Sequence, residues 1–144
     1  MKRQKLYLVL RFAMVEITTS LEWAEKLKEA GWLQEKSYFV WGRIGSGEKM
    51  GIKPRYSEGS RMRYSAPSAE EILRELPEEI EESDYWLEIA KSIHWGDTPW
   101  EIRYRKNGEL LLWDDPEPIR ADTLANASAA MWIYLKENNL LSNG

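Results

Sequence analysis

The sequence predicts an α+β fold: a mainly antiparallel sheet of about four strands with two to three helices packed on it. Three observations support this prediction. Amphipathic segments with helix-capping signals alternate with short segments rich in aromatic and β-branched residues. One Asn-Gly pair lies between two alternating segments, as in a two-residue β-hairpin. The length of 144 residues is typical of one domain, so we expect residues 1–144 to form a single domain.

The first expected element is the apolar run from Leu6 to Val15, which follows a basic start. A signal peptide has the same outline, but Arg11 interrupts the run and no small-residue cleavage site follows it. The run is also too short to span a bilayer. We interpret it as a buried strand, with a first helix as the alternative, and we expect no membrane association and a cytoplasmic location.

A helix is expected next, with Thr19 as its N-cap and Glu22 completing a capping box. Gly31 lies where a residue in the left-handed conformation ends many helices. Residues 37–41 are aromatic and β-branched, and they predict a strand.

Residues 42–66 are predicted to form a long loop or an irregular, weakly paired hairpin. They contain five of the nine glycines, a proline and several serines. Between Arg43 and Arg63 the segment carries six cations and only two carboxylates, in a chain whose formal net charge is −4. We call residues 42–66 the basic arm. A loop of this length inside a compact domain is usually functional or disordered.

The basic arm begins with a glycine-rich sequence that approaches a phosphate-binding P-loop. Gly42 and Gly47 have the required separation, and a predicted strand precedes them. However, Glu48 occupies the position of the P-loop lysine, where a carboxylate would repel phosphate. No helix is predicted to follow either, so we reject a P-loop.

After the arm, Ser68 and Glu71 predict a second capped helix, which Pro77 ends or kinks. The segment from residue 70 to 84 is strongly acidic, with eight carboxylates and one arginine. Residues 85–93 then alternate between apolar and other side chains, which predicts a strand.

A hairpin is predicted around the Asn-Gly pair at 107–108. A type I′ turn there places Ile102 opposite Trp113, and it puts the arginines of the first strand on a half-exposed face. The last helix is expected from residue 122 or 123 to Asn138, with small residues that allow close approach to a sheet.

Composition and motifs argue against an enzyme. The chain has no cysteine, which excludes disulfides, thiolate nucleophiles and cysteine-based metal sites. His94 is the only histidine, and no Gly-x-Ser-x-Gly nucleophile motif accompanies it. The carboxylates do not recur at a metal-ligand spacing. We therefore expect no catalytic residues, no metal and no cofactor, and a hydrolase that uses His94 or an aspartate cluster is the weakest alternative.

Three segments, in this order, resemble small uncharacterised accessory proteins of tailed phages and prophages, a family of unknown function. They are TSLEWAEKLKEAGWLQEKSYFVW (19–41), YSAPSAEEILRELPEEI (64–80) and ADTLANASAAMWIYLKENNLL (121–141). The resemblance leaves out residues 1–18 and carries no known site residues. It implies a product that acts in the bacterial cytoplasm and adjusts host functions or blunts host defences.

The leading hypothesis is a non-enzymatic binding module that engages a host protein or nucleic-acid machine through the basic arm. Arginine supplies forked donors and tyrosine a stacking face, as phosphate-bearing or acidic partners require. One alternative is a binder of a phosphorylated signalling nucleotide, with a pocket at an interface between copies of the chain. A third interpretation is a solvated arm that pairs loosely with the protein's own acidic helix. The candidate binding residues are Arg43, Lys49, Lys53, Arg55, Tyr56, Arg61, Arg63 and Tyr64.

Overall fold

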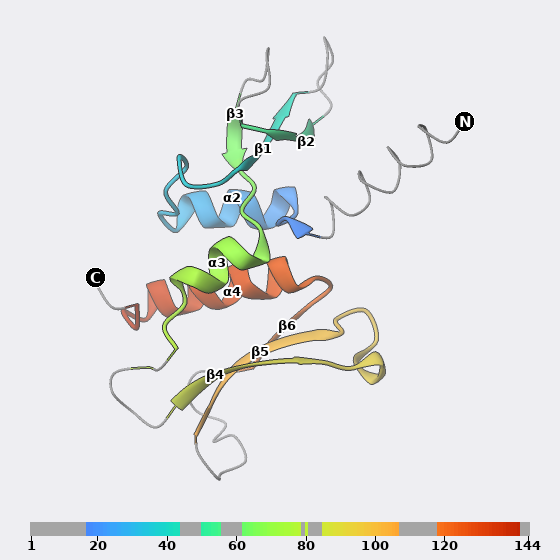
Figure 1. Cartoon of the computed structure of the whole chain (residues 1–144), viewed down its shortest axis with the longest axis vertical. Coiled ribbons are helices and arrows are strands. Elements are labelled where there is room, and N and C mark those ends of the chain that lie inside the picture. The colour runs from blue at the N-terminus through green and yellow to red at the C-terminus, as the bar shows by residue number, and fades with distance from the viewer. Residues whose placement is uncertain are drawn as a thin grey trace.

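The computed structural model describes residues 17–43, 50–55, 62–78, 80, 85–106 and 118–141, and it confirms the α+β class (Figure 1). The described strands form two antiparallel three-stranded sheets, with the orders β2-β1-β3 and β4-β5-β6. The prediction of one sheet of about four strands is therefore wrong in number and arrangement. In chain order the elements are α2 (Leu21–Glu29), β1 (Phe39–Arg43), β2 (Met50–Pro54), β3 (Met62–Ser65), α3 (Ala69–Glu75), β4 (Tyr85–Lys91), the 3₁₀ helix η1 (Ile93–Trp95), β5 (Trp100–Lys106), β6 (Ile119–Ala121) and α4 (Leu124–Glu137).

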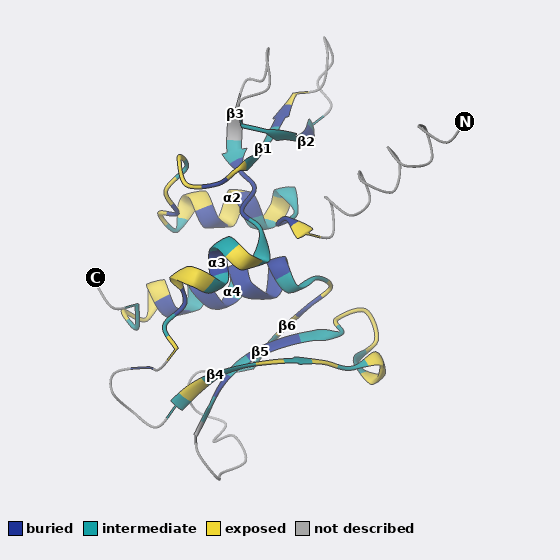
Figure 2. Ribbon diagram, viewed as in Figure 1, coloured by how far each residue is buried: buried dark blue, intermediate teal, exposed yellow. Residues whose placement is uncertain are grey.

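The helices form a middle layer between the two sheets (Figure 1). The first sheet contacts α2, the second sheet contacts α4, and α3 packs along α4. Buried residues concentrate on α4 and on the strand facing it, as Figure 2 shows. The main hydrophobic cluster accordingly joins α2, α3, α4 and the second sheet, and no described residue of the first sheet belongs to it.

α4 is the central helix because small side chains let its neighbours approach closely. Its residues 125–129 are an Ala-Asn-Ala-Ser-Ala stretch, and all five are buried. Asn126 is satisfied there: its Oδ1 accepts from the Ser20 backbone N–H at 2.9 Å, and its Nδ2 donates to Asp122 Oδ1 at 2.8 Å. Further along α4, Trp132 packs edge-to-face on Trp32, with ring centroids 5.2 Å apart.

α2 begins one residue later than predicted. Ser20 is the N-cap, and its Oγ accepts from the Trp23 backbone N–H at 3.4 Å. Thr19 is fully buried, and its backbone carbonyl accepts from the Trp41 indole at 3.0 Å. Thr19 therefore links the start of α2 to β1, and its backbone N–H, which a capping box would pair with Glu22, donates to the Pro67 carbonyl at 3.0 Å.

The other local helix signals are confirmed. Gly31 has a φ of 101°, and the Trp32 N–H donates to the Leu27 carbonyl at 2.8 Å, as in a Schellman motif. The predicted capping box of α3 is complete, with bonds of 3.2 Å and 3.1 Å between Ser68 and Glu71. These signals act within a few residues, so neighbouring elements do not alter them.

The described residues of the basic arm include paired strands, although a loop was one of the two predictions. β2 pairs with one side of β1 from Arg43↔Met50 to Phe39↔Pro54, and β3 pairs with the other side, with a bulge at Trp41/Gly42. Of the two predicted alternatives, the irregular hairpin is closer to this structure. Glycine-rich strands give no alternating side-chain pattern, which is why composition favoured a loop.

The second sheet confirms the predicted faces of β5 but not its predicted partner. Ile102 and Tyr104 are fully buried, whereas Arg103 lies on the opposite, half-exposed face. Ile102 pairs with Ile119 in β6, so its predicted pairing with Trp113 is wrong. The turn predicted at 107–108 and the apolar run 6–15 lie outside the described residues.

Candidate functional site

The first sheet carries the basic arm at one end of the molecule (Figure 1). Arg43 is exposed at the end of β1, and its side chain has no hydrogen bond or ion pair with any other described residue. The ammonium of Lys53, in the paired strand, donates to the backbone carbonyl of Arg43. Two predicted binding residues are thus neighbours, and the described part of the arm contains no carboxylate.

Arg55 has a different position from the other arm cations. Its Nε donates to the Ser37 carbonyl at 2.6 Å, and one terminal nitrogen donates to the Gln34 carbonyl and to Ser65 Oγ, the latter at 3.0 Å. Gln34 Oε1 also accepts from the Ser65 backbone N–H at 2.8 Å. We call Gln34, Ser37, Arg55 and Ser65 the Arg55 cluster. Its bonds tie the ends of β2 and β3 to the segment that follows α2, so Arg55 supports the arm from within.

Of the remaining predicted binding residues, only Tyr64 has a described side chain. Lys28 of α2 places its ammonium 5.0 Å from the centroid of the Tyr64 ring, so Tyr64 faces the helix. Arg63 belongs to β3, but its side chain is outside the description, as are Lys49, Tyr56 and Arg61 entirely.

The acidic helix α3 does not neutralise the described arm. Glu75 pairs with Lys36 at 3.0 Å, and Glu70 pairs with Arg74 on the same helix at 2.6 Å. Arg43 and Lys53 form no ion pair with α3 among the described residues. No described contact therefore supports the interpretation in which the basic arm pairs with the protein's own acidic helix.

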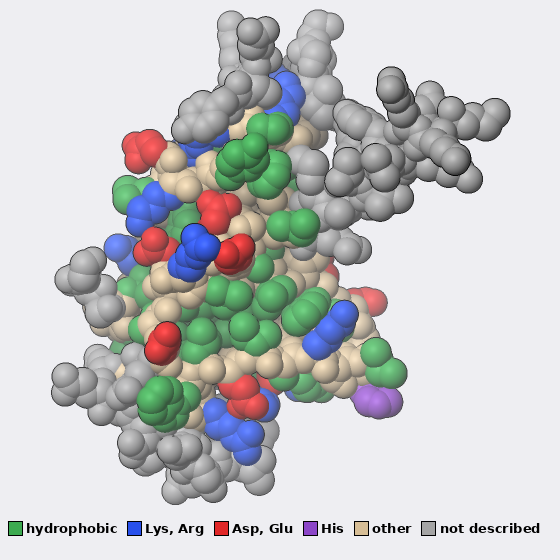
Figure 3. Space-filling view, in the orientation of Figure 1, with side chains coloured by type: hydrophobic (Ala, Val, Ile, Leu, Met, Phe, Trp, Pro, Cys, Tyr) green, Lys and Arg blue, Asp and Glu red, His purple; other side chains and the backbone are tan. Residues whose placement is uncertain are grey.

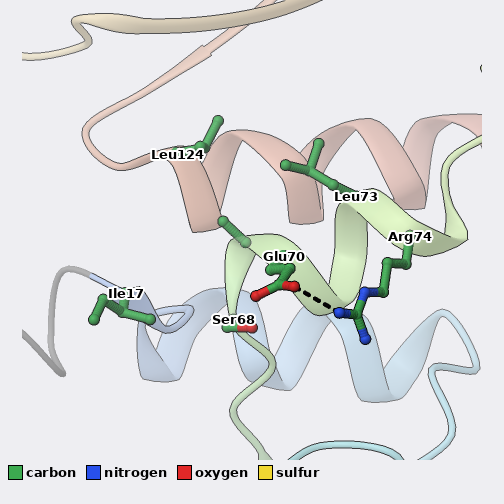
Figure 4. Close-up of a pocket in the computed structure, with 7 residues that line it drawn as sticks. Ile17, Ser68, Glu70, Leu73, Arg74 and Leu124 are labelled. Atoms are coloured by element: carbon green, nitrogen blue, oxygen red, sulfur yellow. Dashed lines mark hydrogen bonds and ion pairs between the residues drawn. The ribbon is translucent and has the colours of Figure 1, made fainter.

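An open hollow of about 590 Å³ lies between the first turns of α3 and α4 (Figure 4). Hydrophobic side chains also gather over α3 and α4 in the space-filling view (Figure 3). Leu73 and Leu124 line the hollow, Ile17 lies across from them, and the Glu70–Arg74 ion pair is its charged part. A phosphorylated nucleotide needs several converging cations, and this lining offers one paired arginine.

The described residues also show no arrangement that supports a catalytic site. His94 is exposed in η1, and its backbone N–H donates to Ser92 Oγ at 3.2 Å. Among the described residues, no three carboxylates or histidines come together as a metal would require.

The outer face of the second sheet carries a group of charges that the sequence analysis missed. Arg103 Nε donates to Glu88 Oε2 at 3.0 Å, and its NH1 donates to Glu101 Oε2 at 2.9 Å. Arg120 Nε donates to Glu101 Oε1 at 3.1 Å, and Arg105 lies 3.6 Å from Glu88. We call this sequence of contacts, Arg105–Glu88–Arg103–Glu101–Arg120, the charge chain.

The charge chain favours the ionised form of Glu88. Hydrogen bonding from Arg103 lowers the pKa of Glu88 below its usual value, against a smaller opposing effect of burial. The hydrogen bond to Glu88 in turn raises the pKa of Arg103. The Glu101 side chain is only 3 % exposed, yet it is bonded to two guanidinium groups. A general acid needs a raised pKa, so the lowered pKa of Glu88 does not suit that role.

Sequence signals for the charge chain were incomplete. Alternation in β5 showed that Arg103 and Arg105 share a face. Arg120 could not be placed, because its neighbour Glu101 depends on the pairing of β6 with β5.

Comparison with protein-family models, curated proteins and solved structures found no match. In the described part of the chain, no helix has the length and apolar character needed to cross a membrane.

Proposed function

We propose that the protein is a non-enzymatic binding module that engages an acidic surface of a bacterial host protein or nucleic-acid complex through the basic arm. The sequence resemblance adds that it is an accessory protein of a tailed phage or prophage that acts in the host cytoplasm, where inhibition of a host defence is one such role.

The observation that carries the proposal is that the described cations of the basic arm have different contacts. Arg55 is used inside the Arg55 cluster, where it supports the sheet. Arg43 is exposed where β1 ends, whereas Lys53 pairs with Val40 nearer the Arg55 cluster, and neither forms an ion pair with a described carboxylate. Cations presented on a supported sheet cost less ordering on binding than the same cations on a flexible chain.

The test reverses the charge of arm residues while leaving Arg55 in place. The variant is Arg43→Glu, Arg61→Glu and Arg63→Glu combined, used as tagged bait in bacterial lysate beside the wild type. Eluates are analysed for proteins and, with and without nuclease treatment, for nucleic acid. We expect a species captured by the wild type to be lost from the variant, and its wild-type binding to weaken with added salt.

The matched control reverses the charge of three exposed lysines on or beside the helices, namely Lys26, Lys36 and Lys136. It changes the net charge by the same amount as the arm variant. This control should capture the same species as the wild type. Identical capture by all three baits would remove the basic arm from the function.

A further inference from the structure

Both ends of the charge chain are arginines, and each end has an indole beside it. Trp86 lies opposite Arg105 in the β4–β5 register and is 47 % exposed. The Arg120 guanidinium carbon lies 4.4 Å from the centroid of the Trp95 ring. Stacking on Trp95 and bonding to Glu101 hold the Arg120 fork in one orientation.

Among the described residues, both terminal arginines have donors without a hydrogen-bond partner. Arg120 uses Nε for Glu101, and no other described residue contacts its two terminal nitrogens within bonding distance. The 3.6 Å separation between Arg105 and Glu88 is longer than an ordinary hydrogen bond, so this contact of Arg105 is weak. The side chain of Arg120 is 47 % exposed, and that of Arg105 is 43 % exposed. A guanidinium fork with free donors matches the two oxygens of a carboxylate.

The spacing of the two ends is set by β5. Arg120 pairs with Glu101, which precedes Arg105 by four residues on the same strand. At the rise of an extended strand, the Cα positions of Arg105 and Arg120 are therefore offset by about 13 Å along the strand direction, on adjacent strands. An extended peptide places residues i and i+4 on one side at the same spacing.

We propose that the outer face of the second sheet binds an extended acidic segment of a partner protein, with carboxylates four residues apart that contact Arg105 and Arg120. This surface is separate from the basic arm, so the inference goes beyond the proposed function. Exposed Trp86 supplies an apolar contact beside Arg105, at one end of the pair, and tryptophan with arginine is the composition that dominates protein–protein hot spots.

The same face disfavours a nucleic acid. Two carboxyl side chains, Glu88 and Glu101, lie between the terminal arginines, so a run of phosphates would meet acceptor oxygens there instead of donors. Free donors occur at two separate positions instead of along a continuous basic groove, which single-stranded nucleic acids require.

The experiment follows the Trp indole and Arg Nε–H signals of the isotope-labelled protein by NMR during titration. The main probe is a short threonine-rich peptide with two glutamates four residues apart. Two further peptides carry the glutamates two residues apart or replace them with glutamine, and a thymidine oligonucleotide represents phosphate polyanions. We expect the first peptide to shift the signals of Trp86, Arg105 and Arg120 at millimolar concentration and to bind more tightly than the other three probes.

Substitutions then locate the site. Arg105→Gln and Arg120→Gln should each weaken binding of the first peptide about tenfold, the loss expected for one charge-assisted hydrogen bond. Arg105→Gln is the decisive variant, because it leaves the buried Glu101 with both partners. Arg74→Gln, at an exposed Arg–Glu pair on α3, is the matched control and should leave binding unchanged.

Three outcomes would overturn the inference. They are the absence of any shift with the first peptide, equal binding by wild type and Arg105→Gln, or tighter binding of the oligonucleotide than of the peptide. The last result would assign the face to phosphate recognition.

Discussion

The two sheets of this protein are attached to the same helical layer in different ways. The second sheet packs fully buried Ile102 and Tyr104 against α4, inside the main hydrophobic cluster. The first sheet contributes no described residue to that cluster, and hydrogen bonds of the Arg55 cluster and the Trp41 indole tie it to the segments around α2. Apolar burial is non-directional and scales with area, whereas hydrogen bonds depend on a few groups.

The second sheet therefore contributes mainly to the stability of the fold, and the first sheet carries the cations of the basic arm. The second sheet can leave its outer face for charges, because its inner face supplies the burial. The first sheet buries Val40 fully but adds no described residue to the main cluster, so we expect the hydrogen bonds of Arg55 to contribute to its attachment. Three substitutions test this comparison, in order of decreasing expected effect.

The largest effect is expected from Ile102→Ala in the second sheet. Ile102 is fully buried, so the substitution removes packed methyl groups and leaves a cavity. We expect the free energy of unfolding to fall by about 2–5 kcal/mol, measured by urea denaturation. Ile93→Ala is the control, because Ile93 is 85 % exposed and should change stability by less than about 0.5 kcal/mol. A loss below about 1 kcal/mol at Ile102 would contradict its place in the core.

The next effect is expected from Arg55→Met in the first sheet. Methionine keeps an apolar stem but cannot donate, so the carbonyls of Gln34 and Ser37 lose a charged donor. We expect a loss of about 1.5–3 kcal/mol in the free energy of unfolding. Arg43→Met removes an equal charge at an exposed position and should be nearly neutral. Equal effects of the two substitutions would mean that Arg55 does not support the sheet.

The smallest effect at neutral pH is expected from Tyr104→Phe, which removes a hydroxyl that donates to the Pro77 carbonyl at 2.7 Å. We expect a loss of about 1 kcal/mol. Burial raises the pKa of Tyr104 well above its usual value near 10. The unfolded chain therefore releases this proton above about pH 10 while the folded chain retains it, so wild-type stability falls as pH rises through that range.

The pH dependence supplies the check on Tyr104. Between neutral pH and the alkaline range, the stability of Tyr104→Phe should decline less steeply than that of the wild type. Tyr38→Phe is the control, because Tyr38 is 58 % exposed and should leave the pH profile unchanged. Identical alkaline profiles for wild type and Tyr104→Phe would show that burial of this phenol does not resist ionisation.

The sequence was sufficient wherever the deciding contacts lie within a few residues. The Ser68–Glu71 capping box, the left-handed Gly31 and the alternating faces of β5 were all predicted correctly. The exception, Thr19, is informative: its N–H donates to the distant Pro67 carbonyl and is not paired with Glu22, and the cap is Ser20. A contact with a distant segment cannot be predicted by a local capping rule.

The candidate site was predictable in composition but not in role. The sequence located a basic segment, yet Arg55 had the same apparent weight there as Arg43. Their roles differ because Gln34 and Ser37 fold back beside Arg55. The charge chain was missed for the same reason, since Arg120 meets Glu101 only through the β5–β6 pairing.

By itself, the sequence determined the α+β class, the end of α2 at Gly31, the capping box of α3 and the two faces of β5. Those properties follow from backbone geometry and from the periodicity of neighbouring side chains. Tertiary structure alone decided that the strands divide into two sheets, that Ile102 pairs with Ile119, and that Arg55 is a support instead of a free cation. Each of these depends on which distant segments come together, and strand pairing and hydrogen bonding between such segments are set by the whole fold.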